Sequence, residues 1–184
     1  MRAIFLDRDG VINRYPGDTK YVTSWREFRF LPNAKKAIAL INTKEYPIFV
    51  ISNQAGVSKQ IFTQDALNTI TSTMLTKLKK NNACIDAVYY CTHREQDNCS
   101  CRKPKTGLIE LALKRENRAI DLKKSFFIGD TILDVHTAKT AGCKSILVLS
   151  GKEKLFNRKN WQIQPDFVFR NLYQAAEFIV GIHE

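Results

Sequence analysis

The sequence predicts a doubly wound α/β fold whose sheet is mostly parallel, and three observations lead to this fold class. Short apolar runs alternate with longer amphipathic segments along the chain. The runs are rich in β-branched and aromatic residues, as buried strands are. Polar residues follow several runs directly, at the edge where ligands bind in such sheets. Strands that alternate with helices in this way form a parallel sheet covered by helices on both faces, as in Rossmann-like proteins.

Each predicted strand is a short run of large apolar side chains. The first reads "AIFL" and the second "PIFVI", and neither contains a charged residue. Their length and composition are typical of strands that are buried inside a sheet. The predicted strands cover residues 3–6, 47–51, 87–90, 126–128, 145–149 and 167–169.

Between the strands lie segments whose apolar residues recur every three or four positions. In the longest of them, four apolar residues fall on one helical face, namely Leu67, Ile70, Met74 and Leu78. Such a stripe would pack against the sheet while the opposite face meets water. The predicted helices cover residues 34–44, 64–80, 107–117 and 132–142.

Length and composition favour one compact domain over residues 1–184. The chain has 184 residues, of which 44% are hydrophobic, which is enough for a sizeable core. No repeat, low-complexity tract or linker marks a second domain. The three insertions, after the first and third strands and before the last, are each too short to fold separately. We therefore expect an α/β domain without a large cap domain.

The charge balance favours an acidic partner. Lys and Arg number 29 against 18 Asp and Glu, which gives a formal net charge of +11. This charge would attract phosphorylated metabolites or nucleic acid. The basic residues are spread along the chain in short clusters, without a recognisable DNA-reading module. We expect a small phosphorylated metabolite as the partner of a monomer, and we do not expect nucleic acid.

The N-terminal residues, the apolar runs and the cysteines indicate in which compartment the protein is found. Charged residues occur within the first seven positions, and no apolar run approaches the roughly 20 residues of a membrane span. Three of the five cysteines cluster with a histidine, while Cys84 and Cys143 stand alone. This distribution fits a reducing compartment better than a disulfide framework. We expect a cytoplasmic protein without membrane contact.

Carboxylates follow the first and fourth predicted strands. Asp7 and Asp9 come directly after the first strand, where residues two apart in a turn can face the same way. Asp130 follows the fourth strand, and Asp134 lies one helical turn further on. Carboxylates that meet at one edge of a sheet form a divalent-metal site or an acid/base pair.

Polar and basic groups follow the second and third strands. The stretch "VISNQAG" places one hydroxyl and two amides after the second strand, on Ser52, Asn53 and Gln54. The stretch "CRKPK" supplies Arg102 and Lys103, which are cations able to hold phosphate oxygens. Together with the carboxylates, they would surround a phosphate group.

A hydrophilic loop after the third strand carries a set of metal ligands. Cys91, His93, Cys99 and Cys101 supply three thiols and one imidazole within eleven positions. This set suits a closed, tetrahedral Zn²⁺ site with no open position for catalysis. Since Arg102 follows the last ligand, a structural zinc would stiffen the start of the phosphate-binding arm.

In this order the motifs resemble those of the haloacid dehalogenase superfamily of phosphatases. The stretches that carry the resemblance are "LDRDGVIN", "SNQAGV", "CRKPK" and "IGDTILDV", and the likeness runs from residue 4 to about residue 169. It implies that Asp7 attacks phosphorus and forms an aspartyl-phosphate. Asp9 would protonate the leaving oxygen and then activate water. A Mg²⁺ would be held by Asp7, the main-chain carbonyl of Asp9, and Asp130.

The resemblance also implies roles around the phosphoryl group. Ser52 and Lys103 would hold this group, whose charge spreads over its equatorial oxygens during transfer. Asp134 would orient Lys103 or a metal-bound water. The alternative for Asp134 is an acid that only favours a helix N-terminus.

The zinc loop narrows the resemblance to small, capless phosphatases that act on heptose 1,7-bisphosphate or on histidinol phosphate. The stretches "FRFLPNAKKAI" and "SNQAGV" follow the heptose pattern, which implies hydrolysis of the C7 phosphate. Carried over by position, Ser52, Asn53 and Gln54 would contact the substrate. Arg102 would read the second phosphate or sugar hydroxyls, and Tyr21 would lie in a substrate-facing loop.

Two alternatives stay open. Five residues separate His93 from Cys99, a spacing similar to that of histidinol phosphatases and some heptose enzymes, whereas many heptose enzymes have a longer loop. Gln60 stands where the heptose pattern usually has glycine, and it lacks glycine's freedom at positive φ. The superfamily also includes DNA 3′-phosphatases, and a net charge of +11 would suit a polyanion.

Overall fold

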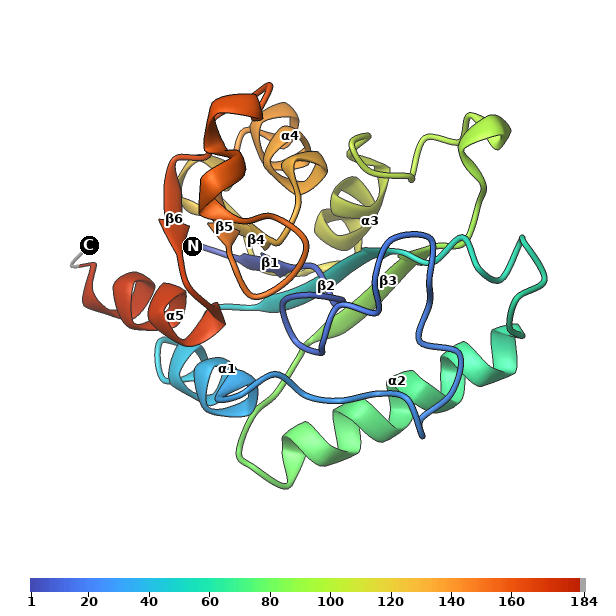
Figure 1. Cartoon of the computed structure of the whole chain (residues 1–184). Coiled ribbons are helices and arrows are strands. Elements are labelled where there is room, and N and C mark those ends of the chain that lie inside the picture. The colour runs from blue at the N-terminus through green and yellow to red at the C-terminus, as the bar shows by residue number, and fades with distance from the viewer. Residues whose placement is uncertain (183–184) are drawn as a thin grey trace.

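Six parallel strands form one sheet through the centre of the molecule (Figure 1). The structure is a computed structural model that describes residues 1–182. The predicted α/β class with a parallel sheet is confirmed, and the predicted strands agree with the observed ones to within about two residues at each end. The strands are β1 (Ile4–Leu6), β2 (Ile48–Asn53), β3 (Ala87–Cys91), β4 (Phe126–Gly129), β5 (Lys144–Val148) and β6 (Phe167–Phe169).

The strand order β3-β2-β1-β4-β5-β6 places β1 and β4 side by side in the middle of the sheet. From β1 the chain moves outward through β2 and β3, and from β4 it moves outward in the other direction. The order therefore reverses between β1 and β4, and a crevice forms beyond the carboxyl ends of these two strands. Asp7 and Asp130 follow these strands, so the topology brings them together.

Helices cover both faces of the sheet (Figure 1). On one face lie α1 (Ala34–Asn42), α2 (Gln64–Lys79) and α5 (Leu172–Gly181). On the other lie α3 (Gly107–Arg115) and α4 (Ile132–Ala141). None of the helices in residues 1–182 combines the length and apolar character that crossing a membrane requires.

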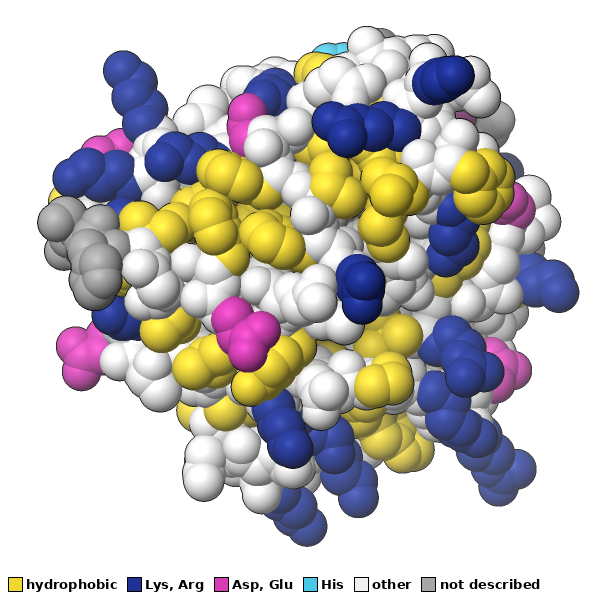
Figure 2. Space-filling model, turned by 60° about the vertical axis from the view of Figure 1, so that its left-hand side comes forward, with side chains coloured by type: hydrophobic (Ala, Val, Ile, Leu, Met, Phe, Trp, Pro, Cys, Tyr) yellow, Lys and Arg dark blue, Asp and Glu magenta, His cyan; other side chains and the backbone are white. Residues whose placement is uncertain are grey.

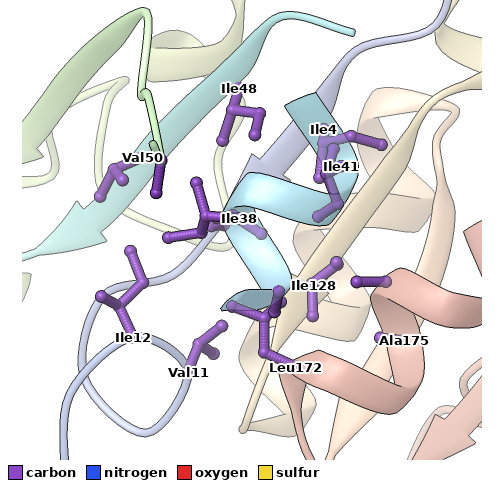
Figure 3. Close-up of a cluster of buried hydrophobic side chains, with 14 of the residues drawn as sticks. Ile4, Val11, Ile12, Ile38, Ile41, Ile48, Val50, Ile128, Leu172 and Ala175 are labelled. Atoms are coloured by element: carbon purple, nitrogen blue, oxygen red, sulfur yellow. The ribbon is translucent and has the colours of Figure 1, made fainter. Parts of the chain in front are cut away.

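Alternate residues of the central strands point into two hydrophobic cores, one on each face of the sheet. Ile4 and Leu6 point to the face of α1 and α5, while Phe5 points to the other face. There its ring lies 5.7 Å from that of Phe49 and 6.3 Å from that of Phe127, between centroids. Figure 3 shows the first core, in which the labelled side chains are Ile4, Val11, Ile12, Ile38, Ile41, Ile48, Val50, Ile128, Leu172 and Ala175. The two cores fix the central strands and thereby the crevice at their ends.

The helix α5 is absent from the sequence prediction. Its signals are present: the Asn171 side chain accepts a hydrogen bond from the backbone N–H of Gln174 at 3.1 Å, as an N-cap does. Apolar residues then recur at helical spacing. They are buried against the sheet and α1, and they are Leu172, Ala175, Ala176 and Ile179.

Gln60 has a left-handed backbone conformation, with φ at 57°. This region is strained for a residue with a Cβ atom, whereas glycine adopts it freely. We expect Gln60→Gly to raise the free energy of unfolding by about 0.5 kcal/mol, because relief of strain outweighs the extra entropy of glycine in the unfolded chain. In thermal denaturation Tm should rise by about 1–2 °C. Gln60→Ala is the control, and a lower Tm for Gln60→Gly would contradict the prediction.

Candidate active site

A cavity of about 270 Å³ lies beyond the carboxyl ends of the central strands. Asp7, Ser52 and Asp130 line it from the ends of β1, β2 and β4, and segment 15–21 closes one side. A larger cavity of about 810 Å³ lies between α4 and residues 153–163. Its lining contains one acid and one histidine and no Lys or Arg. The smaller cavity is the candidate active site, because several carboxylates and cations converge there and not in the larger one.

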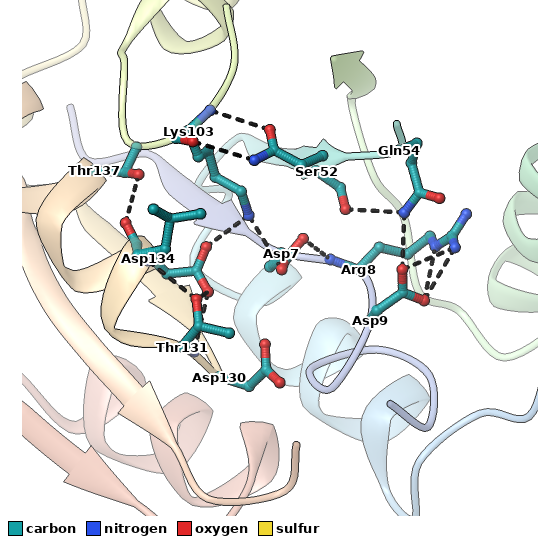
Figure 4. A network of polar contacts seen from close by, with 12 residues as sticks. Asp7, Arg8, Asp9, Ser52, Gln54, Lys103, Asp130, Thr131, Asp134 and Thr137 are labelled. Atoms are coloured by element: carbon teal, nitrogen blue, oxygen red, sulfur yellow. Dashed lines mark hydrogen bonds and ion pairs between the residues drawn. The ribbon is translucent and has the colours of Figure 1, made fainter. Parts of the chain in front are cut away.

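Lys103 bridges two carboxylates beneath the cavity (Figure 4). Its ammonium nitrogen lies 3.1 Å from Oδ2 of Asp7 and 2.6 Å from Oδ1 of Asp134. Burial raises the pKa of Asp7 to about 6, although the nearby Lys103 ammonium acts in the opposite direction. Burial disfavours the Lys103 ammonium, but the two carboxylates outweigh it and raise the pKa of Lys103. Lys103 is therefore held as a cation against the Asp7 carboxylate.

Asp130 completes a cluster of three buried acids. Carboxylate oxygens of Asp7, Asp130 and Asp134 lie within 4.8 Å of one another. The backbone N–H of Lys152 donates to Oδ2 of Asp130 at 2.7 Å, but Oδ1 is buried without a partner among residues 1–182. Burial, and then the two neighbouring carboxylates, raise the pKa of Asp130 well above its usual range. The three carboxylates therefore carry more negative charge than the single Lys103 ammonium offsets.

These oxygens fit a divalent cation of the Mg²⁺ type, which prefers carboxylate ligands. Both oxygens of Asp134 are already engaged, one by Lys103 and the other by the backbone N–H and hydroxyl of Thr131. Asp7 and the open oxygen of Asp130 are thus the better donors. Asp134 instead takes part in the capping box of α4 and accepts a hydrogen bond from Lys103, so it does more than favour a helix N-terminus.

Asp9 lines the same cavity as Asp7, but its carboxylate is engaged by neighbouring donors. Its oxygens accept hydrogen bonds from Arg8 Nη2 at 3.0 Å, Asn13 Nδ2 at 2.8 Å and Gln54 Nε2 at 2.8 Å (Figure 4). The physical reason is the guanidinium of Arg8, which is fully buried and needs a counterion. The sequence shows Arg8 next to Asp9 but gives no signal that its guanidinium is buried.

The polar residues after β2 have different partners. Asn53 holds the backbone of Lys103 from both sides, accepting from its N–H at 3.1 Å and donating to its carbonyl at 3.3 Å. Ser52 and Asn53 line the cavity. Gln54 does not, because its side chain is fully buried and its amide donates to Asp9 and, at 3.3 Å, to the Ser52 hydroxyl. The predicted substrate contact of Gln54 therefore finds no support here, and the clamp formed by Asn53 was not foreseen.

Arg102 and Tyr21 also line the cavity. Arg102 donates from Nη1 to the carbonyl of His93 at 3.3 Å, so its guanidinium stays beside the cysteine loop. The Tyr21 ring packs on Phe62 at 5.9 Å between centroids, and the Lys59 ammonium lies 5.6 Å from its centroid. Both residues are positioned to meet a ligand that enters the cavity.

The four predicted metal ligands of the loop converge on one point. The Sγ atoms of Cys91, Cys99 and Cys101 lie 3.2–3.6 Å apart, and Nδ1 of His93 lies 3.3 Å from Sγ of Cys101. A tetrahedral Zn²⁺ with ligands at about 2.3 Å would separate them by a little under 4 Å. The cluster thus fits a metal ion that stiffens the loop.

Comparisons with known proteins identify relatives of this chain. A family model described as HAD-hydrolase-like matches residues 100–175. The D-glycero-D-manno-heptose-1,7-bisphosphate 7-phosphatase of Chlorobaculum tepidum is 36% identical over 98% of this chain and 95% of its own length. The D-glycero-beta-D-manno-heptose-1,7-bisphosphate 7-phosphatase of Neisseria meningitidis serogroup A is 31% identical over 98% of this chain and 95% of its own length.

A solved structure extends the likeness to three dimensions. The heptose 1,7-bisphosphate phosphatase of B. bronchiseptica, complexed with magnesium and phosphate, superposes with a TM-score of 0.86. It is 30% identical, and the match covers 98% of each chain. The carboxylate cluster, the parallel topology and relatives of this identity over nearly the full length lead to one conclusion. The chain belongs to the haloacid dehalogenase-like family of phosphatases.

Proposed function

We propose that this enzyme is a Mg²⁺-dependent phosphatase that hydrolyses the C7 phosphate of D-glycero-D-manno-heptose 1,7-bisphosphate through an aspartyl-phosphate. The observation that carries the proposal is the meeting of Asp7, Lys103 and Asp130 in the cavity at the ends of β1 and β4. Near full-length similarity to heptose bisphosphate phosphatases supports the choice of substrate.

The chemistry follows from the contacts of these side chains. Asp7 attacks phosphorus, and Lys103 and Ser52 hold the oxygens of the transferring group. Asp134 and Asn53 keep Lys103 in place through its ammonium and its backbone. Asp7 and Asp130 would bind Mg²⁺, which supplies the positive charge that lets a carboxylate approach a phosphate. The domain assignment of residues 1–184 and the monomeric state stay part of the proposal.

Asp9 has a less direct part in this scheme. It lines the cavity, yet its carboxylate accepts hydrogen bonds from donors on Arg8, Asn13 and Gln54. To protonate a leaving oxygen and later activate water, its side chain must turn from these donors toward the cavity. The Arg8 contact therefore holds Asp9 in a resting position until substrate binds.

We assign a structural Zn²⁺ to Cys91, His93, Cys99 and Cys101, and a prediction follows for Cys99→Ser. Elemental analysis of the purified wild type should give one zinc per chain, retained after mild chelation, while activity requires added Mg²⁺. In Cys99→Ser, zinc content, Tm and phosphate release should fall together, because the metal contributes to folding of the loop. Cys84→Ser is the matched control. Fully active wild type without zinc would refute the assignment.

Histidinol phosphate is the second candidate substrate, favoured by the five residues between His93 and Cys99. Phosphate release should be compared for heptose 1,7-bisphosphate, histidinol phosphate and a 3′-phosphorylated oligonucleotide. We expect the highest kcat/KM for the heptose substrate. A higher kcat/KM for histidinol phosphate would show that the enzyme is a histidinol phosphatase instead.

A nucleic-acid substrate has less support. Figure 2 shows Lys and Arg side chains scattered over the visible face among apolar and neutral groups, with no continuous basic stripe. Binding along a phosphodiester backbone needs cations in register with successive phosphates. The oligonucleotide should therefore be the poorest of the three substrates.

A further inference from the structure

A short loop after β5 is built around the metal-binding carboxylate. Ser150 donates from its hydroxyl to the carbonyl of Gly10 at 2.7 Å, and the backbone N–H of Lys152 donates to Asp130 at 2.7 Å. A Cβ atom on Gly151 would lie 1.9 Å from Oδ2 of Asp130, so only glycine fits there. The backbone of Lys152 is therefore fixed relative to the catalytic centre.

The side chain of Lys152 reaches across the mouth of the same cavity. Lys152 lines the cavity, and its ammonium lies 2.8 Å from Oδ1 of Asp18, which stands between the lining residues Gly17 and Thr19. Tyr15 donates its hydroxyl to the same oxygen of Asp18 at 2.6 Å. The ion pair is well exposed, with 47% of the Lys152 side chain and 71% of the Asp18 side chain accessible to solvent. The hydrogen bond with Lys152, and then that with Tyr15, lowers the pKa of Asp18.

Such an ion pair is easily exchanged. Water and salt screen exposed pairs, so they contribute little to stability. A phosphate group carries more charge than a carboxylate and offers three acceptor oxygens, so it competes well for an ammonium. Asp18 keeps its hydrogen bond from Tyr15 after Lys152 leaves, so the exchange does not leave it without a partner.

Two of the other cations that line the cavity, Lys103 and Arg102, are less suited to a second anion. The Lys103 ammonium is buried between Asp7 and Asp134, at the position of the reacting group. Arg102 is hydrogen-bonded to the carbonyl of His93. Lys152 combines a backbone locked to the centre with an ammonium whose only described partner is exchangeable.

We propose that Lys152 binds the second, non-reacting phosphate of a sugar bisphosphate, and that Asp18 occupies Lys152 until this phosphate displaces it. The inference rests on the proposed function, since it assumes that the reacting phosphate lies at Asp7. Lys152 is thus a specificity residue. Asp18 competes with the second phosphate for the Lys152 ammonium, and this competition sets how strongly Lys152 selects bisphosphates over monophosphates.

The test measures kcat/KM for heptose 1,7-bisphosphate and for p-nitrophenyl phosphate, which lacks a second phosphate. Lys152→Gln should lower kcat/KM about tenfold to hundredfold for the bisphosphate, mainly through KM, and leave the monophosphate within about twofold. Asp18→Asn should raise kcat/KM for the bisphosphate by about twofold to fivefold. In the Lys152→Gln background, Asp18→Asn should have no effect. Lys36→Gln, which removes an exposed charge from α1, is the control for net charge.

An equal loss for both substrates in Lys152→Gln would overturn the proposal, because the residue would then act through Asp130. A fall for the bisphosphate in Asp18→Asn would also overturn it, because the ion pair would then only support the loop. Wild-type hydrolysis of p-nitrophenyl phosphate tests the proposed function separately. Should neither substrate be hydrolysed, calorimetric binding of the bisphosphate to Asp7→Asn, with and without Lys152→Gln, still decides the inference: equal affinities would refute it.

Discussion

Asp7→Asn is expected to lower phosphate release by at least about 10⁴-fold, because the substitution removes the negative charge of the attacking group and little volume. The variant should keep the fold, which circular dichroism and thermal denaturation would check. Phosphate release from heptose 1,7-bisphosphate with saturating Mg²⁺ is the measurement. Release at the wild-type rate would rule out Asp7 as the nucleophile. Asp9→Asn is the comparator: covalent phosphorylation followed by slow hydrolysis in that variant would support a two-step reaction.

The same variant has a second expected property, a change in stability with pH. Burial raises the pKa of Asp7 to about 6, above the value of about 3.9 in an unfolded chain. Because the folded value is the higher one, ionisation of Asp7 costs stability as the pH rises through this interval, and the full cost is present above it. In the absence of Mg²⁺ at pH 7.5, the unfolding free energy of Asp7→Asn should therefore be about 2–3 kcal/mol higher than that of the wild type. The difference should vanish near pH 4.

Lys103→Met is expected to have the opposite effect on stability and a large effect on catalysis. The substitution leaves Asp7 and Asp134 buried side by side without their shared cation. Breaking a buried pair of this kind costs about 3–5 kcal/mol, which corresponds to a fall in Tm of roughly 10 °C. Loss of a donor to the transferring group should lower kcat/KM by a further 10²–10³-fold or so.

A double variant separates these two effects. Adding Asp134→Asn to Lys103→Met removes one of the unpaired charges, so part of the lost Tm should return while activity stays low. Lys103→Arg should not restore activity, because a planar guanidinium cannot replace a compact ammonium between two carboxylates. If Lys103→Met kept kcat/KM within tenfold of the wild type, Lys103 would have no contact with the reacting group.

The parallel sheet and the meeting of Asp7 with Asp130 were predictable from the sequence, since the carboxyl ends of adjacent strands share one edge. The hydrogen-bond partners of Asp9 were not predictable from the sequence. Its direction depends on the buried guanidinium of Arg8, and burial of a charged side chain cannot be read from its position next to a strand. The contact between Asp18 and Lys152 joins two loops distant in sequence, where no periodicity acts.

Three cysteine sulfur atoms lie close together in the loop, so oxidants should be able to inactivate the enzyme. The Sγ atoms of Cys91, Cys99 and Cys101 lie 3.2–3.6 Å apart, and a disulfide needs about 2.05 Å. While a metal ion binds the thiolates, their lone pairs are engaged and oxidation is suppressed. Removal of the ion in air would let two of the thiols lose two electrons and two protons to the oxidant and join covalently. Because Arg102 and Lys103 follow Cys101 directly, chelation combined with oxidation should inactivate the enzyme, and a dithiol with added zinc should restore it.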